Sequence, residues 1–267
     1  MEDNDDNWKV KCKMDERSAL NSDRGALTAW GTRAARVYDD LSADRYRDHD
    51  NHLPDSAPSM ALASFLSSTC ARCGSDLTVL DVGCGTGRYF WALGGVRTLV
   101  GLDASPAMLA RAHAPYAADR IRIHEITLIH GDLLTVQLEH GRFDLVYSIG
   151  VLAEYTPLTA QVVDRIANWL KPGGRFAFSA VRPDSPTVPR TLKRRLGRGV
   201  ARWAPGPLSR AARRRLLSGG LYADAERIRE LLSPRFTIES LEDFQSESHL
   251  HHLCVARLTG VQEPDRL

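Results

Sequence analysis

The sequence has few cysteines and no long apolar run, and these absences narrow the classes of protein it can be. Its five cysteines are scattered over 267 residues, and the one close pair, Cys70 and Cys73, has no second ligand pair at zinc spacing. We therefore expect reduced thiols and no metal site. No apolar stretch approaches the roughly 20 residues that a membrane span needs. The first ten residues are acidic and polar, unlike a signal peptide, so we expect a cytoplasmic protein without a transmembrane segment.

Net charge is almost absent as well. The chain carries 35 basic and 33 acidic residues, a formal charge of +2, which does not indicate a general nucleic-acid binder. That small total conceals an uneven distribution, because residues 182–229 contain 13 basic residues and only three acidic ones. Hydrophobic residues make up 43% of the chain, which is ordinary globular composition. The length suits one full α/β domain with a sizeable core.

Short apolar runs alternate with helical patterns from residue 77 onward. Five such runs predict parallel strands buried on both faces, at residues 77–82, 98–103, 126–130, 143–148 and 175–179. Helical patterns predict helices at 26–41, 60–68, 88–93, 106–113 and 158–170. Two further runs, 236–241 and 250–258, suit an antiparallel pair at the edge of the sheet. The pattern predicts an α/β fold with a mostly parallel sheet.

A glycine-rich loop follows the first predicted strand. Gly83, Gly85 and Gly87 alternate just before the helix predicted at 88–93, whose N-terminus would offer free N–H groups. Asp103 ends the next strand about 20 residues later, where an acid of a doubly wound fold binds a ribose diol. These features predict a site for a nucleoside-containing cofactor. The dinucleotide fingerprint fails, because its last glycine would have to stand where Arg88 does, and no phosphate-loop motif is present.

The segment Asp81–Gly87, with its D-x-G-x-G-x-G pattern, resembles the first motif of class I S-adenosylmethionine (SAM) dependent methyltransferases. Four further segments resemble motifs of that family in the same order: 101–109, 131–133, 143–148 and 170–175. The resemblance implies a Rossmann-like seven-stranded, mostly parallel sheet with an antiparallel C-terminal strand pair, a helical N-terminal lid and a helical cap insertion. It implies a tail and lid at 1–60, and a methyltransferase domain at 61–267 that includes the cap at 182–230.

The resemblance also implies which residues hold the cofactor. Gly83, Gly85 and Gly87 would let the methionine moiety pass close to the backbone, Asp81 would bond toward its ammonium, and Asp103 would hold both ribose hydroxyls. The other implied contacts are Tyr38 on a helix closing over the cofactor, Ala104, Met108, Asp132 and Leu133 around the adenine, and Ser148 and Ile149 beneath the sulfonium. Loop capping is the alternative role for Asp81 and Asp132, since aspartate is a common turn residue.

The implied reaction is methyl transfer to an oxygen or nitrogen of a small metabolite by in-line displacement. Such a reaction needs a general base only when the acceptor must lose a proton early. Glu154, Tyr155 and His52 are the candidate catalytic residues, although Glu154 could equally begin the next helix. An oxidoreductase that uses NAD(P), or a binding protein that has lost turnover, are alternatives that the fold alone leaves open.

The segment 190–215 is the most unusual part of the chain, with ten basic residues and no acidic one. Apolar residues at helical spacing, such as Leu192, Leu196 and Val200, favour two cap helices with most arginines in solvent. Uncompensated charges still create a field, which would attract an anionic acceptor. Peripheral contact with a membrane surface, or a lipid-like or RNA acceptor, are the alternatives, although no RNA-binding module is recognisable and we expect no specific nucleic-acid partner.

Overall fold

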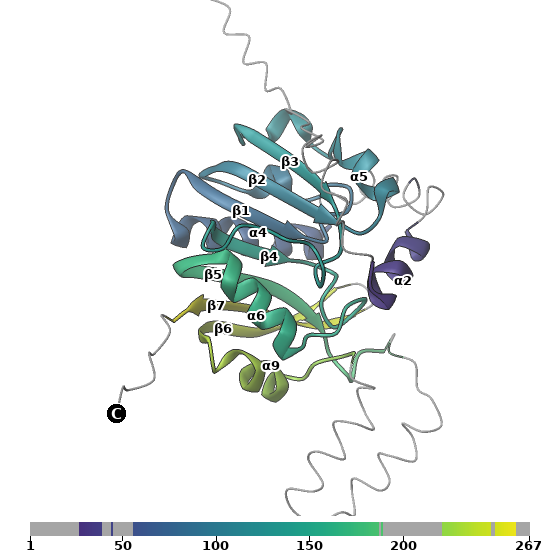
Figure 1. The fold of residues 1–267 in the computed structure, drawn as a ribbon, viewed down its shortest axis with the longest axis vertical. Helices are drawn as coiled ribbons and strands as arrows, with labels where there is room; N and C mark the ends of the chain where they lie inside the picture. Colours follow the sequence, from purple (N-terminus) through teal and green to yellow (C-terminus); the bar gives the residue numbers. More distant parts are fainter. Residues whose placement is uncertain are drawn as a thin grey trace, which may run out of the picture.

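A computed structural model of the chain describes residues 27–38, 44, 56–186, 188, 221–246 and 249–259. Seven strands form one sheet in the order β3-β2-β1-β4-β5-β7-β6 (Figure 1). The first five are parallel, and β7 pairs antiparallel with both β5 and β6. The strands are β1 (Leu77–Val82), β2 (Val96–Asp103), β3 (Glu125–His130), β4 (Phe143–Ser148), β5 (Leu170–Val181), β6 (Phe236–Gln245) and β7 (Leu250–Leu258). The predicted mostly parallel sheet with an antiparallel C-terminal pair is confirmed.

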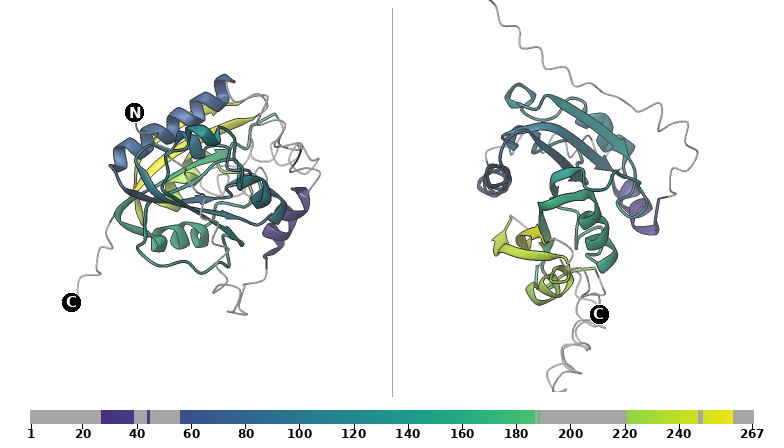
Figure 2. Two further views of the ribbon diagram at one scale, coloured as in Figure 1. Left: turned by 90° about the horizontal axis from the view of Figure 1, so that it is seen from above. Right: turned by 60° about the vertical axis from the view of Figure 1, so that its left-hand side comes forward.

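Helices cover both faces of this sheet (Figures 1 and 2). The described helices are α2 (Ala29–Val37), α4 (Ala57–Cys73), α5 (Pro106–Ala112), α6 (Ala160–Trp169) and α9 (Ala225–Leu232), of which α2 lies beside the sheet. Side chains of α6 and α9 pack in one apolar cluster with Leu80, Val146 and Phe178 of the sheet. Side chains of α4 and α5 pack on the other face. Because strand side chains alternate between faces, the buried runs of the sequence supply both clusters.

The last motif segment, 170–175, makes a turn within strand β5. Phe143 pairs with Leu170, but Leu145 pairs with Arg175, so four residues of β5 lie opposite the single Asp144 of β4. The extra residues include Gly173, whose φ of 75° is a left-handed conformation that glycine adopts freely. The Lys171 ammonium spans the irregularity and donates to the Asp144 carboxylate at 2.8 Å. The turn therefore forms as a bulge between paired segments.

The helix predicted at 88–93 is wrong. Only one 3₁₀ turn, Phe90–Ala92, follows the glycine loop. Six residues stand between Gly87 and the pair Gly94–Gly95, which is too few for a stable helix that begins and ends at glycine. No α-helix N-terminus therefore follows the loop directly. The positive end of a helix dipole that was expected there is absent from this part of the described chain.

Two other helices differ in extent from the prediction. Helix α4 begins at Ala57, three residues before the expected start, because Ser56 caps it by accepting from the Ser59 N–H. The predicted boundary between residues 60 and 61 falls inside this helix. Helix α6 begins at Ala160 with Thr159 as its N-cap, so Glu154 does not start it. The basic segment 190–215, most of the predicted lid and His52 lie outside the described residues.

Candidate functional site

The glycine loop runs from the end of β1 against the end of β2. Gly83, Gly85 and Gly87 have φ angles of 78°, 55° and 76°, left-handed values that glycine adopts freely. A Cβ on Gly83 would overlap Val151, while a Cβ on Gly85 would approach the Met108 methyl at 3.2 Å. Gly83 and Gly85 line a cavity, whereas Gly87 packs against Phe90 and serves the turn itself.

Asp103 joins the loop to the helix that follows β2. Its carboxylate accepts hydrogen bonds at 2.8 Å from the backbone N–H groups of Gly85 and Ser105. Burial raises the pKa of Asp103, and these two bonds partly offset the increase. The carboxylate lines the cavity at the end of its strand and keeps further lone pairs, so it can accept from a diol.

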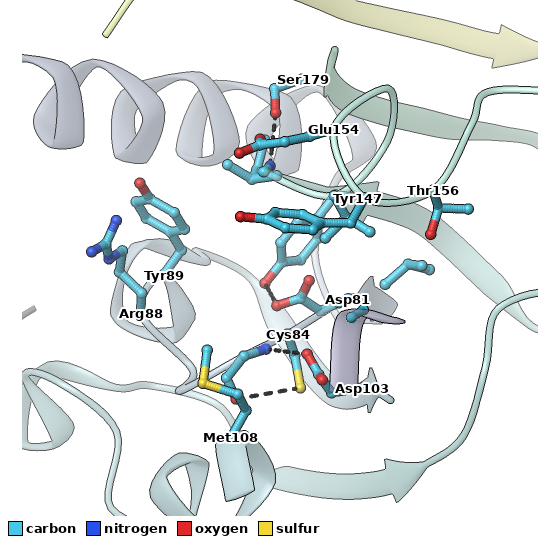
Figure 3. Close-up of a pocket in the computed structure, with 18 of the residues that line it drawn as sticks. Asp81, Cys84, Arg88, Tyr89, Asp103, Met108, Tyr147, Glu154, Thr156 and Ser179 are labelled. Carbon is cyan, nitrogen blue, oxygen red and sulfur yellow. Dashed lines mark hydrogen bonds between the residues drawn. The ribbon is translucent and has the colours of Figure 1, made fainter. Parts of the chain in front are cut away.

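Asp81 is a buried acid of the site, and its partner was not predicted from the sequence. The Tyr147 hydroxyl donates to the Asp81 carboxylate at 2.6 Å, and both side chains are buried (Figure 3). Burial raises the pKa of Asp81 to about 8, the Tyr147 bond lowers it, and the neighbouring Asp103 adds to the increase. A cationic ligand group would favour the ionised form of such a buried acid, so this position suits a cation.

Asp132, predicted at the adenine, is engaged by the N-terminus of α2. Its Oδ2 atom accepts from the backbone N–H of Thr28 at 2.8 Å and from the Thr28 hydroxyl, and its Oδ1 accepts from the Leu134 N–H. A Cβ on Gly31 would overlap Oδ2, so α2 packs directly on this carboxylate. Asp132 thus caps its own loop, as the alternative role required, and also attaches the N-terminal helix to the cavity.

These groups surround one cavity of about 550 Å³, a volume typical of ligand pockets. In Figure 3, Asp103 and Met108 lie at one end, Asp81 and Tyr147 in the middle, and Glu154 and Ser179 at the other end. The predicted residues that line it are Tyr38, Asp81, Gly83, Gly85, Asp103, Ala104, Met108, Asp132, Leu133, Ile149, Glu154 and Tyr155. Ser148 does not, because its hydroxyl points into the sheet and donates to the Val82 carbonyl at 2.8 Å.

Glu154 and Tyr155 lie in the loop between β4 and α6 and face the cavity. Burial raises the pKa of Glu154 to about 7. That value suits proton transfer near neutral pH. Tyr155 packs edge-on against Tyr38 of the N-terminal segment, with 5.2 Å between ring centroids. The two tyrosines connect the N-terminal helix to the loop that carries Glu154.

The far end of the cavity comes from the last strands, for which the sequence predicted no role in the site. Asp81 pairs with Tyr147, and Tyr147 pairs with Ala177, two residues before Ser179. His251 pairs with Val181, two residues after Ser179, so these polar side chains share one face of the sheet. The Ser179 hydroxyl accepts from the Gly150 N–H at 2.9 Å and so fixes the loop after β4 (Figure 3).

Two features are absent from the residues that the structure describes, a membrane-spanning helix and a cluster of metal-ligating side chains. Among those residues, no helix is long and apolar enough to cross a membrane. Over the same ranges, no group of three or more histidine, cysteine or acidic side chains could hold a metal ion. Cys70, Cys84 and Cys254 are buried free thiols, and Cys73 is a half-buried one.

The sheet order, the glycine loop and the acid after β2 agree with the class I methyltransferase fold that the motifs predict. Residues 79–174 match the methyltransferase domain family. An uncharacterized methyltransferase of Synechocystis sp. is 38% identical over 103 residues, which are 38% of this chain and 45% of that protein. The chain thus spans less than half the length of this relative, so the match covers the domain and not the whole protein.

Solved structures give the same fold over more of the chain. An S-adenosylmethionine dependent methyltransferase from Mesorhizobium loti has 25% sequence identity and a TM-score of 0.52, over 77% of this chain and 99% of that one. The N-methyltransferase NodS from Bradyrhizobium japonicum WM9, in complex with S-adenosyl-L-homocysteine (SAH), is 21% identical with a TM-score of 0.55, over 82% and 97%. The chain therefore carries the class I fold that its motifs predict.

Proposed function

We propose that this protein is a SAM-dependent methyltransferase that methylates an oxygen or nitrogen of a small metabolite. The order of polar groups along the cavity carries the proposal: a diol-binding acid, then a buried acid, then a carboxyl group at neutral pKa (Figure 3). A cofactor that consists of a nucleoside and an amino acid with an ammonium group, placed next to an acceptor, needs these groups in this order. The methyltransferase relatives support it.

The residues at the cofactor end fit SAM. Gly83 and Gly85 line the cavity with bare backbone in left-handed conformations, close to Val151 and Met108. Asp103 offers a carboxylate at the end of β2, and Asp81 offers a buried acid for an ammonium. We assign these residues to the methionine and ribose, and Ala104, Met108 and Leu133 to the adenine. When bound, SAM supplies an electrophilic methyl group on its sulfonium. The chain itself supplies position and excludes water.

Glu154 is the candidate general base at the acceptor end. Its carboxyl group lines the cavity, and its pKa of about 7 leaves a large fraction ionised at neutral pH. A carboxylate in that state accepts a proton from a hydroxyl or from an ammonium as the acceptor is methylated. Tyr155 orders the same loop through Tyr38, and we assign it a binding role.

Two parts of the chain bear on which acceptor charge the site would favour. The described lining of the cavity contains Asp81, Asp103, Asp132 and Glu154 but one arginine, Arg88. This lining supports an uncharged or cationic acceptor, whereas an anionic acceptor rests on the basic segment 190–215. The small-molecule acceptor and the cytoplasmic location stay predictions from the sequence.

An NAD(P)-dependent oxidoreductase is the less supported alternative. Dinucleotide pyrophosphates bind at the N-terminus of the helix after the glycine loop. Here only the 3₁₀ turn Phe90–Ala92 follows that loop.

Two assays test the proposal on the full chain. In a thermal-shift assay, we expect SAM and SAH to raise the melting temperature and NAD to leave it unchanged. With methyl-labelled SAM and a panel of neutral, cationic and anionic small acceptors, we expect SAH to accumulate with at least one acceptor. Stabilisation by NAD and not by SAM would reject the proposal. Stabilisation by SAM without turnover on any acceptor would favour a binding protein that lacks activity.

A further inference from the structure

The end of the cavity beyond Glu154 contains a buried histidine whose hydrogen bonding is incomplete. His251 of β7 is 8% exposed, and its ring borders the cavity. Its Nε2 atom lies 3.3 Å from the Ser246 hydroxyl, but its Nδ1 atom has no partner within the described part of the chain. Buried polar side-chain atoms nearly always have a partner, so an orphaned one in a residue that lines a cavity suggests a ligand.

The groups around His251 are aromatic and carry little charge. Phe244, its cross-strand neighbour on β6, lies 6.0 Å from it between ring centroids, and His249 lies at 5.6 Å. Burial and the adjacent His249 and His252 lower the pKa of His251 to about 4, and burial lowers the pKa of His249. Both imidazoles are therefore neutral at pH 7, and they can exchange hydrogen bonds with a ligand without attracting an anion.

His252, the next residue of β7, is a useful comparison for His251. His252 is 7% exposed, but it faces the other side of the sheet and pairs through Nδ1 with Asp243 at 2.9 Å. It does not line the cavity. The strand thus carries two adjacent histidines of similar burial. The Nδ1 atom of His252 pairs with Asp243, whereas His251 lines the cavity and its Nδ1 atom has no partner within the described residues.

We propose that His251, Ser246, Phe244 and His249 form the acceptor subsite, and that it takes an uncharged, hydroxylated aromatic ring. The ring would pack against Phe244 and His249, which line the same cavity, since aromatic rings attract one another. A hydroxyl group of the ring would bond to the orphaned nitrogen of His251. His251 is then a positioning residue that presents the acceptor toward Glu154. This inference rests on the proposed function, because it names the acceptor class of the same site.

The test measures binding of small phenols to the full chain saturated with SAH. The probes are resorcinol, which is uncharged, 4-hydroxybenzoate, which is anionic, and tyramine, which is cationic. Titrations compare wild type, H251F, H251Q and the matched control H252F. H251F fills the same space without a hydrogen-bonding atom, and H251Q restores such an atom. Melting temperatures and SAH affinities of all four proteins are recorded in parallel.

We expect wild type to bind resorcinol at least tenfold more tightly than 4-hydroxybenzoate or tyramine. H251F should lose at least tenfold in resorcinol affinity, while its SAH affinity changes less than twofold and its melting temperature does not fall. H251Q should recover most of the loss, and H252F should bind resorcinol like wild type. Wild-type protein that binds SAH but no probe, or prefers a charged one, would overturn the acceptor class and leave the proposed function standing. Equal resorcinol affinity in H251F would overturn the role of His251. Failure to bind SAH would overturn both proposals.

Discussion

Cofactor binding should depend strongly on pH, because the acid that meets the ammonium is itself half-protonated near pH 8. Asp81 is buried, and its pKa is raised to about 8. If only the carboxylate form binds the ammonium, the apparent association constant follows the ionised fraction of Asp81. That fraction is about 1% at pH 6 and about half at pH 8, so SAH affinity should rise about fiftyfold over this range.

Isothermal titration of SAH at pH 6, 7 and 8 measures this dependence directly. D81N should bind SAH more weakly by about 1.5–3 kcal/mol at pH 8, the value of a hydrogen bond to a charged group, and should lose the pH dependence. Y147F removes the bond that lowers the pKa of Asp81, so its affinity should rise at higher pH than in wild type. The exposed control D76N should behave like wild type. A wild-type affinity that is constant from pH 6 to pH 8 would refute this reasoning.

The same buried acid predicts an opposite effect on stability. The pKa of Asp81 is higher in the folded chain than in the unfolded one, so the folded state binds more protons between pH 4 and pH 8. Stability of the ligand-free protein should therefore fall as pH rises through this window. D81N lacks the ionisable group, so at pH 8 it should melt at or above the wild-type temperature. This result would separate its loss of SAH binding from unfolding.

Three further predictions address other groups of the cavity. D103A should abolish SAH binding in a titration while circular dichroism remains native, and undiminished affinity would rule out the ribose assignment. E154Q should lower kcat roughly 10²- to 10⁴-fold and remove the fall in rate below about pH 7, whereas an unchanged pH–rate profile would exclude Glu154 as the base. G31A should weaken SAH binding, because its Cβ would push α2 off Asp132. The control G94A, with open space around its Cβ, should not, and equal effects of the two would contradict this role of α2.

The cofactor half of the site could be predicted from sequence because its residues are contiguous in short motifs. Asp81, the glycines and Asp103 lie at the ends of two neighbouring strands, and parallel strands bring such ends together. The strands β1 and β4 were predicted with their observed bounds, since buried apolar runs end at turn residues. The helix after the glycine loop was not, because its pattern was too short to compete with Gly94 and Gly95.

The acceptor half depends on pairing between distant strands, and no local pattern reveals it. Ser179 and His251 are 72 positions apart in the chain, and each is an ordinary residue of an apolar strand. Only the antiparallel register of β5 and β7 places them on the same face as Asp81. Tyr147 was missed for a similar reason, because as part of a strand motif it looked like a core aromatic. The signal that could have found these three is a polar residue near the carboxyl end of a parallel strand, as for Tyr147 and Ser179, or near the start of the antiparallel strand β7, as for His251.

The central claim is that this cavity binds SAM through Asp81 and Asp103. The most direct measurement is isothermal titration of SAH and of NAD into the wild-type chain and D103A at pH 8. We expect saturable 1:1 binding of SAH to wild type, no measurable SAH binding to D103A, and no heat of binding with NAD. Saturable binding of NAD without binding of SAH, or equal SAH affinities of wild type and D103A, would contradict the claim.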